Sequence, residues 1–315
     1  MQASASQFVT RDTCPMCGGD SYATIYSTRL AGDALSTYFE EVFAPRGGLD
    51  KGLLGDTNFV LCRCSECSGL FQLHIPGSEL LQEIYNPNLS ADVIERKKRG
   101  KADPAARYRH AAEIISLLSL FPKAGQGLSV LDYGVGWGHW AVMAKAFGFK
   151  VFGTELDKDR ANFARQNGIE IIDDEDIPNH AFDLINTEQV FEHLPKPLET
   201  LRHLSRGLSE DGIIKVSVPN SHGVERSLSA PEWRKVNEHL NPVAPLEHIN
   251  CFKRKSLTLM AQRVGLTERP LPVIAQYRSI QFSMPLQHLI REFLVPINRN
   301  ILKRSNYVLL SASRR

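Results

Sequence analysis

The sequence predicts an α/β fold in which a seven-stranded sheet with crossover helices follows a small N-terminal metal-binding module. From Leu128 onward, short β-rich apolar runs alternate with segments of helical period, which is typical of a parallel sheet. Five of the six cysteines lie at or before Cys67. In a chain kept in a reducing compartment, such closely spaced cysteines indicate metal ligands before disulfides.

The composition is typical of a soluble globular protein. Hydrophobic residues make up 43% of the 315 residues and charged residues 23%, which excludes disordered, collagen-like and coiled-coil chains. The formal net charge of +2 gives no global field that would favour nucleic acid or an anionic membrane as a partner. We expect no membrane span and a cytoplasmic location, because no apolar run approaches roughly 18 residues and the first residues contain no apolar signal region.

Local patterns predict the individual elements. Strands are expected at residues 129–132, 150–155, 170–172, 182–186, 212–218, about 268–276 and 306–313. Helices are expected at residues 139–147, 158–166, 197–207 and 253–264. A further amphipathic helical segment at about 285–304 could face lipid or a partner, although packing on the domain is the simpler interpretation.

The chain divides into three regions by composition. Residues 1–75 hold the clustered cysteines and a helical segment at 33–43 and form the predicted zinc-binding module. Residues 76–122 are a basic helical connector, in which the charged run at 95–101 is interpreted as a solvated helix face. Residues 123–315 contain the predicted sheet and therefore form the main domain.

The most informative motif follows the first strand of this sheet and contains three glycines. Gly134, Gly136 and Gly138 allow the backbone to turn sharply and to approach a ligand closely. Glu155 ends the next predicted strand, where its carboxylate can accept hydrogen bonds from both hydroxyls of a ribose. The third glycine comes one residue earlier than in a dinucleotide-binding GxGxxG loop, and Asp132 precedes the loop. Both features favour a cofactor without phosphate and with a cationic amino-acid tail.

This stretch resembles motif one of the class I S-adenosyl-L-methionine (SAM) methyltransferases. The resemblance implies a Rossmann-like sheet over about residues 128–315 and SAM as the cofactor. It implies that Asp173 and Asp174 lie at the adenine and that Glu188 and Gln189 line the methionine side. For the two aspartates, a solvated acidic turn is the alternative interpretation.

Two CxxC knuckles, one at residues 14–17 and the other at 64–67, predict a structural zinc site. Two residues between the cysteines of a pair allow a tight turn that presents both sulfurs to one tetrahedral Zn²⁺. The stretch between the knuckles is longer than the roughly 15 to 20 residues usual for this pattern, so an inserted helix and a Gly-rich loop are expected there. Cys62 is an alternative to Cys64, but its spacing is less suited. The predicted ligands are Cys14, Cys17, Cys64 and Cys67.

A four-cysteine zinc module joined to a class I domain resembles the sugar C-methyltransferases, which act on nucleotide-linked keto-deoxysugars. The sequence around each knuckle carries this resemblance, and residues 247–252 resemble the EHxxxF segment of that family. The resemblance implies acid/base roles for Glu247 and His248 and an active-site position for His193. Where the family has a tyrosine two residues before its glutamate, this sequence has Pro245.

The expected activity is therefore SAM-dependent methylation of a sugar, nucleotide-sugar or glycan intermediate, at carbon or at oxygen. Either acceptor atom must lose a proton, and His248 is the expected general base, with Glu247 as its support and His193 as a second polar group. A structural role is the alternative for each histidine. Other interpretations are an RNA or protein methyltransferase that uses the zinc module for recognition, and a SAM-binding protein without turnover. The glycine spacing disfavours an NAD-dependent oxidoreductase.

Overall fold

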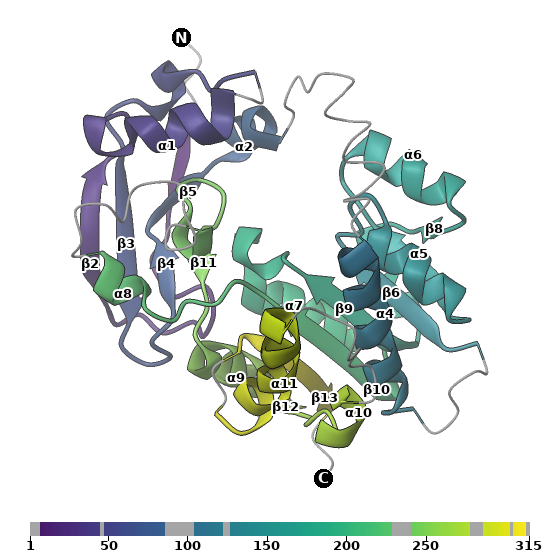
Figure 1. Cartoon of the computed structure of the whole chain (residues 1–315). Helices are drawn as coiled ribbons and strands as arrows, with labels where there is room; N and C mark the ends of the chain where they lie inside the picture. Colours follow the sequence, from purple (N-terminus) through teal and green to yellow (C-terminus); the bar gives the residue numbers. More distant parts are fainter. Residues whose placement is uncertain are drawn as a thin grey trace. The chain divides into compact units, whose positions relative to one another are not determined.

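The computed structural model describes residues 7–44, 47–85, 104–121, 127–228, 241–277, 286–302 and 305–312, so the charged run at 95–101 lies outside the described residues. The chain divides into two compact units whose segments alternate along the sequence (Figure 1). The first unit contains residues 1–91, 191–198 and 218–260, and the second contains 92–190, 199–217 and 261–315. Two segments of the expected 123–315 domain thus pack with the N-terminal region.

The second unit is built on a seven-stranded sheet, which confirms the predicted α/β fold class. The strand order is β12-β13-β10-β9-β6-β7-β8. The five strands from β6 to β10 pair in parallel, whereas β13 is antiparallel to both β10 and β12. The strands are β6 (Ser129–Tyr133), β7 (Lys150–Thr154), β8 (Glu170–Ile171), β9 (Phe182–Glu188), β10 (Leu208–Ser217), β12 (Leu266–Glu268) and β13 (Tyr307–Ala312).

Helices alternate with these strands, and α5, α6, α7 and α9 lie where the sequence predicts helices. Asp157 begins one of them by accepting a hydrogen bond from the Arg160 amide at 2.9 Å, the usual role of an N-cap carboxylate. α4 and α5 pack against each other (Figure 1). The helices are α4 (Pro104–Leu118), α5 (His139–Ala146), α6 (Lys158–Gln166), α7 (Pro197–Arg206), α9 (Arg254–Arg263), α10 (Val273–Tyr277) and α11 (Leu286–Asn300).

The strand expected at 268–276 is wrong over most of its length. β12 ends at Glu268, and α10 begins at Val273. Pro270 and Pro272 lie between them, and a proline has no N–H to donate to a strand ladder. Pro272 directly precedes α10, where its fixed φ angle suits the start of a helix.

The first unit contains a small sheet of order β11-β4-β3-β2 and a two-stranded sheet of β1 and β5. Strand β11 belongs to the C-terminal half of the sequence, and it pairs with β4 through Asn250 opposite Phe71. Helix α1 coincides with the predicted helix and buries Leu35, Tyr38 and Phe39 in the core of this unit. The elements are β1 (Phe8–Thr10), β2 (Tyr22–Arg29), α1 (Asp33–Phe43), β3 (Asn58–Cys64), β4 (Leu70–Gln72), β5 (His74–Pro76), α2 (Ser78–Tyr85), α8 (Val224–Ser227) and β11 (Asn250–Cys251), with short 3₁₀ turns η2 (Lys51–Leu54), η4 (Phe191–His193) and η5 (Asn241–Val243). The 3₁₀ turn η3 (Asp174–Asn179) belongs to the second unit.

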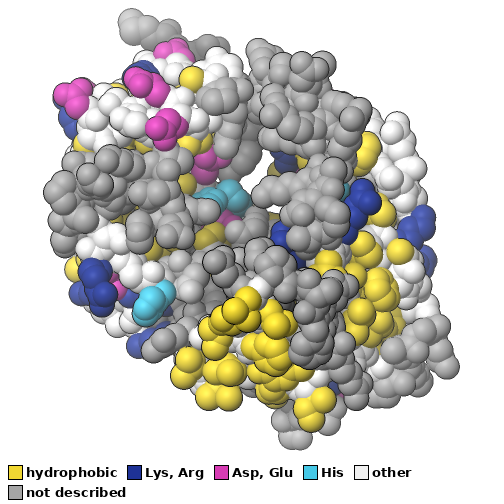
Figure 2. All heavy atoms as spheres, viewed as in Figure 1, with side chains coloured by type: hydrophobic (Ala, Val, Ile, Leu, Met, Phe, Trp, Pro, Cys, Tyr) yellow, Lys and Arg dark blue, Asp and Glu magenta, His cyan; other side chains and the backbone are white. Residues whose placement is uncertain are grey.

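Helix α11 exposes apolar side chains, which form the hydrophobic patch over this helix in Figure 2. Leu286, Ile290, Phe293 and Leu294 are each between 40% and 70% exposed. Packing on the domain therefore covers only part of the predicted amphipathic segment. Among the helices within the described ranges, none has the length and apolar character needed to cross a membrane.

Candidate active site and metal centre

The glycine loop after β6 has the backbone conformation that requires glycine. The φ angles of Gly134, Gly136 and Gly138 are +73°, +55° and +71°, in a region that L side chains rarely adopt. A Cβ atom at Gly134 would lie 3.0 Å from the Val190 side chain, so the loop also packs closely there. A Cβ atom at Gly136 would meet no protein atom within 4 Å, which leaves space for a ligand above the loop.

Glu155 follows β7 directly and holds the glycine loop. Its Oε2 accepts the Gly136 N–H at 2.9 Å, and its Oε1 accepts the Asp157 N–H at 3.0 Å. A carboxylate has about four acceptor sites, so two backbone contacts leave capacity for two ribose hydroxyls. The structure therefore brings together the loop and the carboxylate that the sequence assigns to one cofactor.

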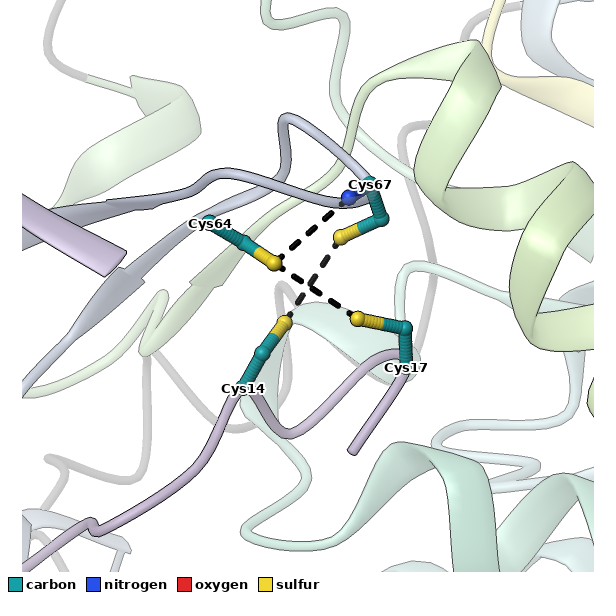
Figure 3. A group of neighbouring side chains, drawn as sticks. All are labelled: Cys14, Cys17, Cys64 and Cys67. Atoms are coloured by element: carbon teal, nitrogen blue, oxygen red, sulfur yellow. Dashed lines mark hydrogen bonds between the residues drawn. The ribbon is translucent and has the colours of Figure 1, made fainter. Parts of the chain in front are cut away.

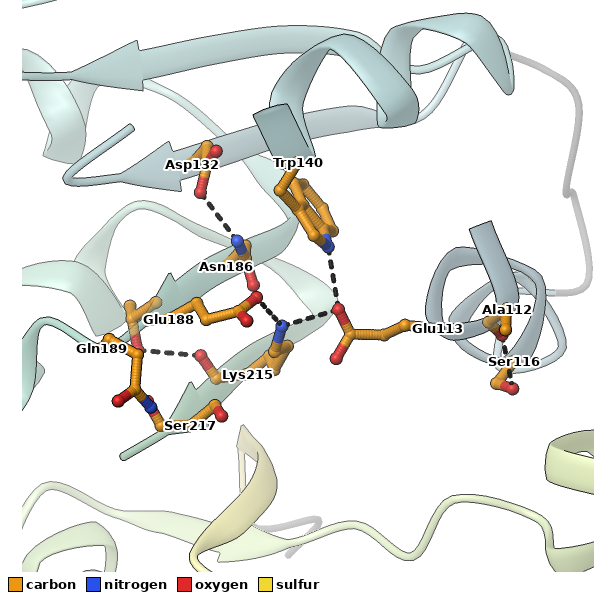
Figure 4. A network of polar contacts seen from close by, with 11 residues as sticks. Ala112, Glu113, Ser116, Asp132, Trp140, Asn186, Glu188, Gln189, Lys215 and Ser217 are labelled. Carbon is orange, nitrogen blue, oxygen red and sulfur yellow. Dashed lines mark hydrogen bonds and ion pairs between the residues drawn. The ribbon is translucent and has the colours of Figure 1, made fainter. Parts of the chain in front are cut away.

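A row of polar side chains crosses β6, β9 and β10, the three central strands of the large sheet in the second unit (Figure 4). In register, Asp132 on β6 lies beside Asn186 on β9, and Asn186 lies beside Lys215 on β10. Asn186 donates a hydrogen bond to Asp132 at 2.7 Å. The Lys215 ammonium forms ion pairs with Glu113 at 2.8 Å and with Glu188 at 3.1 Å. This network fixes Glu188 at the end of β9.

Burial and neighbouring charges shift the pKa values of the ionisable side chains in this row. Burial raises the pKa of Asp132 to about 7, although the hydrogen bond from Asn186 opposes the shift. Burial alone would lower the pKa of Lys215, but Glu113 and Glu188 raise it above its usual range, so the lysine is charged. Sequence reasoning missed Lys215. The available signal was a lysine inside the apolar run 212–218, because a charge in a buried strand requires a partner.

The remaining residues assigned to the cofactor lie in turns after β8 and β9. Asp173 and Asp174 are exposed at the start of η3, and Asp174 lies 3.4 Å from the ring of His203. Burial and the neighbouring Asp174 raise the pKa of Tyr133. Gln189 has a φ angle of +54°, and its N–H donates to Ser217 O at 2.8 Å. Polar contacts therefore hold both turns, the one after β8 and the one after β9.

The four predicted cysteine ligands converge in the first unit (Figure 3). The Cys14 and Cys67 sulfurs are 3.6 Å apart, and the Cys17 and Cys64 sulfurs are 3.5 Å apart. Sulfurs at the corners of a tetrahedron around Zn²⁺ lie about 3.8 Å apart when each Zn–S bond is about 2.3 Å. Cys62 is outside this group, and its sulfur lies 3.8 Å from the Thr24 hydroxyl. The arrangement fits one tetrahedral ion.

Without a metal ion, the pKa values of Cys14, Cys17 and Cys67 differ widely. The hydrogen bond from Cys67 lowers the pKa of Cys14 to about 6, whereas burial raises the pKa of Cys17 to about 12. The hydrogen bond with Cys14 and burial raise the pKa of Cys67 far above its usual range. A divalent metal ion bound by all four sulfurs would supply the positive charge that four adjacent thiolates require.

Two histidines, a carboxylate and a tyrosine form a second polar cluster in the first unit. The His193 and His248 rings are 4.8 Å apart between centroids and nearly perpendicular. His193 Nδ1 donates to the Glu247 carbonyl oxygen at 2.9 Å, because a carbonyl oxygen can only accept. The buried Tyr38 hydroxyl lies 2.9 Å from Pro245 O and 3.4 Å from Glu247 Oε2. The three residues expected at the acceptor thus lie together.

Tyr38 is a member of this cluster that the sequence did not indicate. It lies on α1, far from residue 245 in the chain, yet it brings a tyrosine hydroxyl to Glu247. Burial and the neighbouring His248 lower the pKa of His193 to about 4, so this imidazole is neutral near pH 7.

Two buried amides hold the segments that carry this cluster. Gln72 Nε2 donates to the carbonyl oxygens of Ala244 and His248, each at 3.0 Å, and its Oε1 accepts the Leu246 N–H at 3.2 Å. These bonds fix a turn in which Leu246 has a φ angle of +69°, which is strained for a leucine. Asn250 Nδ2 donates to Phe191 O and Leu194 O at 2.9 and 2.7 Å, on either side of His193.

Arg11 links the first cysteine knuckle to both histidine segments. This buried residue lies three positions before Cys14. Its guanidinium donates to Gln72 O at 3.3 Å, Ile249 O at 3.1 Å and Pro195 O at 3.1 Å. A planar guanidinium with five donors can bridge three carbonyls in this way. The four-cysteine module and the histidine segments therefore share one hydrogen-bond framework.

The strand order with its antiparallel β13, together with the glycine loop and Glu155, defines the class I methyltransferase architecture. A family model described as a methyltransferase domain matches residues 105–269, just over half of the chain. The chain belongs to this family and is a SAM-dependent methyltransferase. No curated protein matches the sequence at a significant level.

Solved structures with a similar fold include the plantazolicin methyltransferase BpumL in complex with a monoazolic desmethylPZN analog and SAH. It is 19% identical, the match covers 74% of this chain and 93% of that chain, and the TM-score is 0.47. A SAM-dependent methyltransferase from Archaeoglobus fulgidus is 18% identical over 70% of this chain and 99% of that chain, with a TM-score of 0.43.

Proposed function

We propose that this methyltransferase acts on a sugar, nucleotide-sugar or glycan intermediate, with His248, Glu247 and His193 at the acceptor. The cluster of two histidines, the Glu247 carboxylate and the Tyr38 hydroxyl is the observation that supports this proposal. Acceptors of this class present a hydroxyl or a carbon beside a ketone, and both must lose a proton to become nucleophiles. Tyr38 adds a hydroxyl beside Glu247, which strengthens the resemblance to the sugar C-methyltransferases despite Pro245.

SAM binds over the glycine loop in this proposal. Its methionine end lies at residues 134–138 and is lined by Asp132, Glu188 and Gln189, while its ribose hydroxyls bind Glu155. The adenine lies near residues 173–174. Leu156 follows Glu155 and is fully exposed, so it provides an apolar surface for the adenine ring.

His248 is the proposed general base. His193 is oriented by the Glu247 carbonyl and acts as a second polar group at the acceptor. His248 takes the proton from the acceptor O–H or C–H bond, and the released electron pair forms the bond to the methyl carbon. The S–CH₃ bond of SAM breaks in the same step, and its electrons remain on sulfur in S-adenosylhomocysteine.

The test of this proposal is an acceptor panel of nucleotide sugars with labelled SAM, with RNA and peptide acceptors in parallel. Once an acceptor is found, His248→Asn and His248→Ala are compared in single-turnover assays at saturating substrates. General-base loss typically slows the chemical step about a hundred to ten thousandfold. A rate within about threefold of the parent in both variants would remove His248 from the mechanism. Transfer to RNA or peptide alone would overturn the acceptor class.

The four cysteines form a closed structural zinc site in this proposal, because four protein ligands leave no position for substrate. The role of the ion is to fold residues 1–75, whose strand β4 contributes Gln72 to the turn at His248. Elemental analysis of protein purified without added metal should find one zinc per chain. Less than about half an equivalent, with all four thiols reactive, would contradict the site.

A further inference from the structure

Glu192, His193 and His248 offer one ligand atom each, and these three atoms lie within 4.8 Å of one another. We propose that these residues form a second metal site, distinct from the four cysteines, that binds a divalent transition-metal ion such as Zn²⁺, Mn²⁺ or Co²⁺. Two histidines and one carboxylate are the ligand types that such ions prefer. This proposal rests on the proposed function, because that function places the same two histidines at the acceptor.

The two imidazole rings already have the separation that a shared ion would impose. A ring centroid lies about 3.2 Å from the ion when the ligating nitrogen is about 2.1 Å away. For N–metal–N angles of about 90° to 110°, the centroids are then about 4.5 to 5.3 Å apart. The His193 and His248 centroids are 4.8 Å apart, with 76° between the ring planes.

His193 makes the hydrogen bond that a metal-binding histidine usually makes through its other ring nitrogen. Its Nδ1–H donates to the Glu247 carbonyl oxygen, so the lone pair of the neutral ring is on Nε2. Metal-binding histidines usually donate their other ring N–H to a carbonyl or carboxylate, which fixes the tautomer and the ring orientation. The fully buried Glu192 adds a carboxylate at a depth where its attraction to a cation is weakly screened.

The backbone that carries the three ligands is fixed without an ion. Asn250 bonds the carbonyls of Phe191 and Leu194, which flank Glu192 and His193. Gln72 bonds the His248 carbonyl. Little conformational entropy is therefore lost when an ion binds, which is the property of a preorganised site.

Three protein ligands leave open positions, as in catalytic metal sites. An acceptor hydroxyl or enolate oxygen is the ligand class that suits such a position, and coordination lowers the pKa of a bound O–H group. In the metal-bound form His248 is a ligand, and Glu247 beside the Tyr38 hydroxyl is the remaining base. His248 acts as the base only in the metal-free form.

The experiment uses the full-length protein with its structural zinc in place. Co²⁺ is titrated by calorimetry and by visible absorption, because Co²⁺ bound to nitrogen and oxygen lacks the intense thiolate bands of a cysteine site. We expect one additional equivalent without thiolate bands. His193→Ala and Glu192→Gln should weaken this binding by at least about a hundredfold, and His74→Ala, a histidine of the same unit outside the cluster, should leave it unchanged.

Each variant is first shown to retain one zinc and the parent affinity for SAM. If a folded His193→Ala protein cannot be obtained, His248→Asn replaces it in the same titration. The proposal is overturned if no second equivalent of Co²⁺, Mn²⁺ or Zn²⁺ binds, or if the second equivalent persists in the ligand variants. Unchanged methyl transfer in protein freed of the second ion would overturn a catalytic role for the metal but leave the proposed function intact. Metal binding without transfer to any sugar acceptor would overturn the proposed function but leave the second metal site in place.

Discussion

Asp132 is a carboxyl group whose charge changes near neutral pH because the sheet buries it. Burial raises its pKa to about 7, while the hydrogen bond from Asn186 and the charge of Lys215 favour the ionised form. Glu188 and Glu113 oppose ionisation. SAM carries a sulfonium and an ammonium group, and a cation bound beside this carboxyl would favour its ionised form.

We therefore predict that SAM binding releases a proton from Asp132. Below pH 7 the carboxyl is protonated, so the affinity for SAM should fall as the pH falls from 8 to 5.5, by up to about tenfold per unit. Asp132→Asn should bind SAM more weakly at pH 8 and lose this pH dependence. Calorimetry in buffers of different ionisation enthalpy measures the released proton, and the exposed Asp159→Asn is the control. The same pH dependence in Asp132→Asn would contradict the prediction.

Glu155 should contribute strongly to SAM affinity. Glu155→Ala removes the proposed acceptor for two ribose hydroxyls and the contact that holds the Gly136 N–H, so we expect a loss of about 1.5 to 3 kcal/mol, or roughly ten to a hundredfold. Calorimetry with SAM is the measurement. Glu170→Ala, at an exposed position of β8, should bind like the parent. Unchanged affinity in folded Glu155→Ala would show that the ribose lies elsewhere.

Sequence reasoning could identify site residues only where a local motif carries them. Gly134 and Glu155 stand at fixed positions relative to predicted strands, so their convergence could be inferred. The contact between Tyr38 and Glu247 joins residues 209 positions apart, and no local pattern indicates it. The ion pair between Lys215 and Glu113 spans 102 positions and depends on how α4 packs on the sheet.

At the scale of elements, parallel strands and crossover helices were predictable because each has its own apolar period. Strand β11 was not, because it consists of Asn250 and Cys251 and is stabilised by pairing with β4. Its pairing joins the Glu247–His248 turn to the four-cysteine module, which composition alone assigned to a separate region. The strand expected at 268–276 was wrong because two prolines outweighed its apolar character.

Arg11 should act as the connection between the first cysteine knuckle and both histidine segments. Arg11→Met removes three charge-assisted hydrogen bonds, each worth about 1.5 to 3 kcal/mol before relaxation, while it leaves the four thiols in place. We expect amide hydrogen exchange to become at least about tenfold faster in peptides covering 191–198 and 244–251. Zinc content and SAM affinity should not change.

The matched control is Arg63→Met, which removes a partly exposed arginine paired with Glu225 in the same unit. Its exchange pattern over the two histidine segments should remain that of the parent. Faster exchange confined to residues 7–12 in Arg11→Met would show that the guanidinium stabilises only its own strand end.

At the scale of the whole molecule, the chain builds two compact units from interleaved segments, and within the described residues each unit contains a hydrophobic core. One core joins α1 and its sheet to residues such as Leu246, and the other joins β6, α5 and β13. The chain leaves the large sheet after β9 and again after β10, and the bond from Gln189 N to Ser217 O ties these two exits together. We therefore expect the thermal stability of each unit to depend on the ligand that this unit binds.

We predict two thermal transitions, each shifted by one ligand. The proposed zinc ligands belong to the first unit, so removal of the ion with a chelator should lower one transition markedly, because structural zinc contributes directly to folding energy. SAM at about one hundred times its Kd should stabilise the second unit by about 2.7 kcal/mol and raise the other transition. Differential scanning calorimetry with each ligand added or removed separately is the measurement. A single transition that both ligands shift equally would show that the two cores unfold as one cooperative unit, since independent units respond only to the ligand they bind.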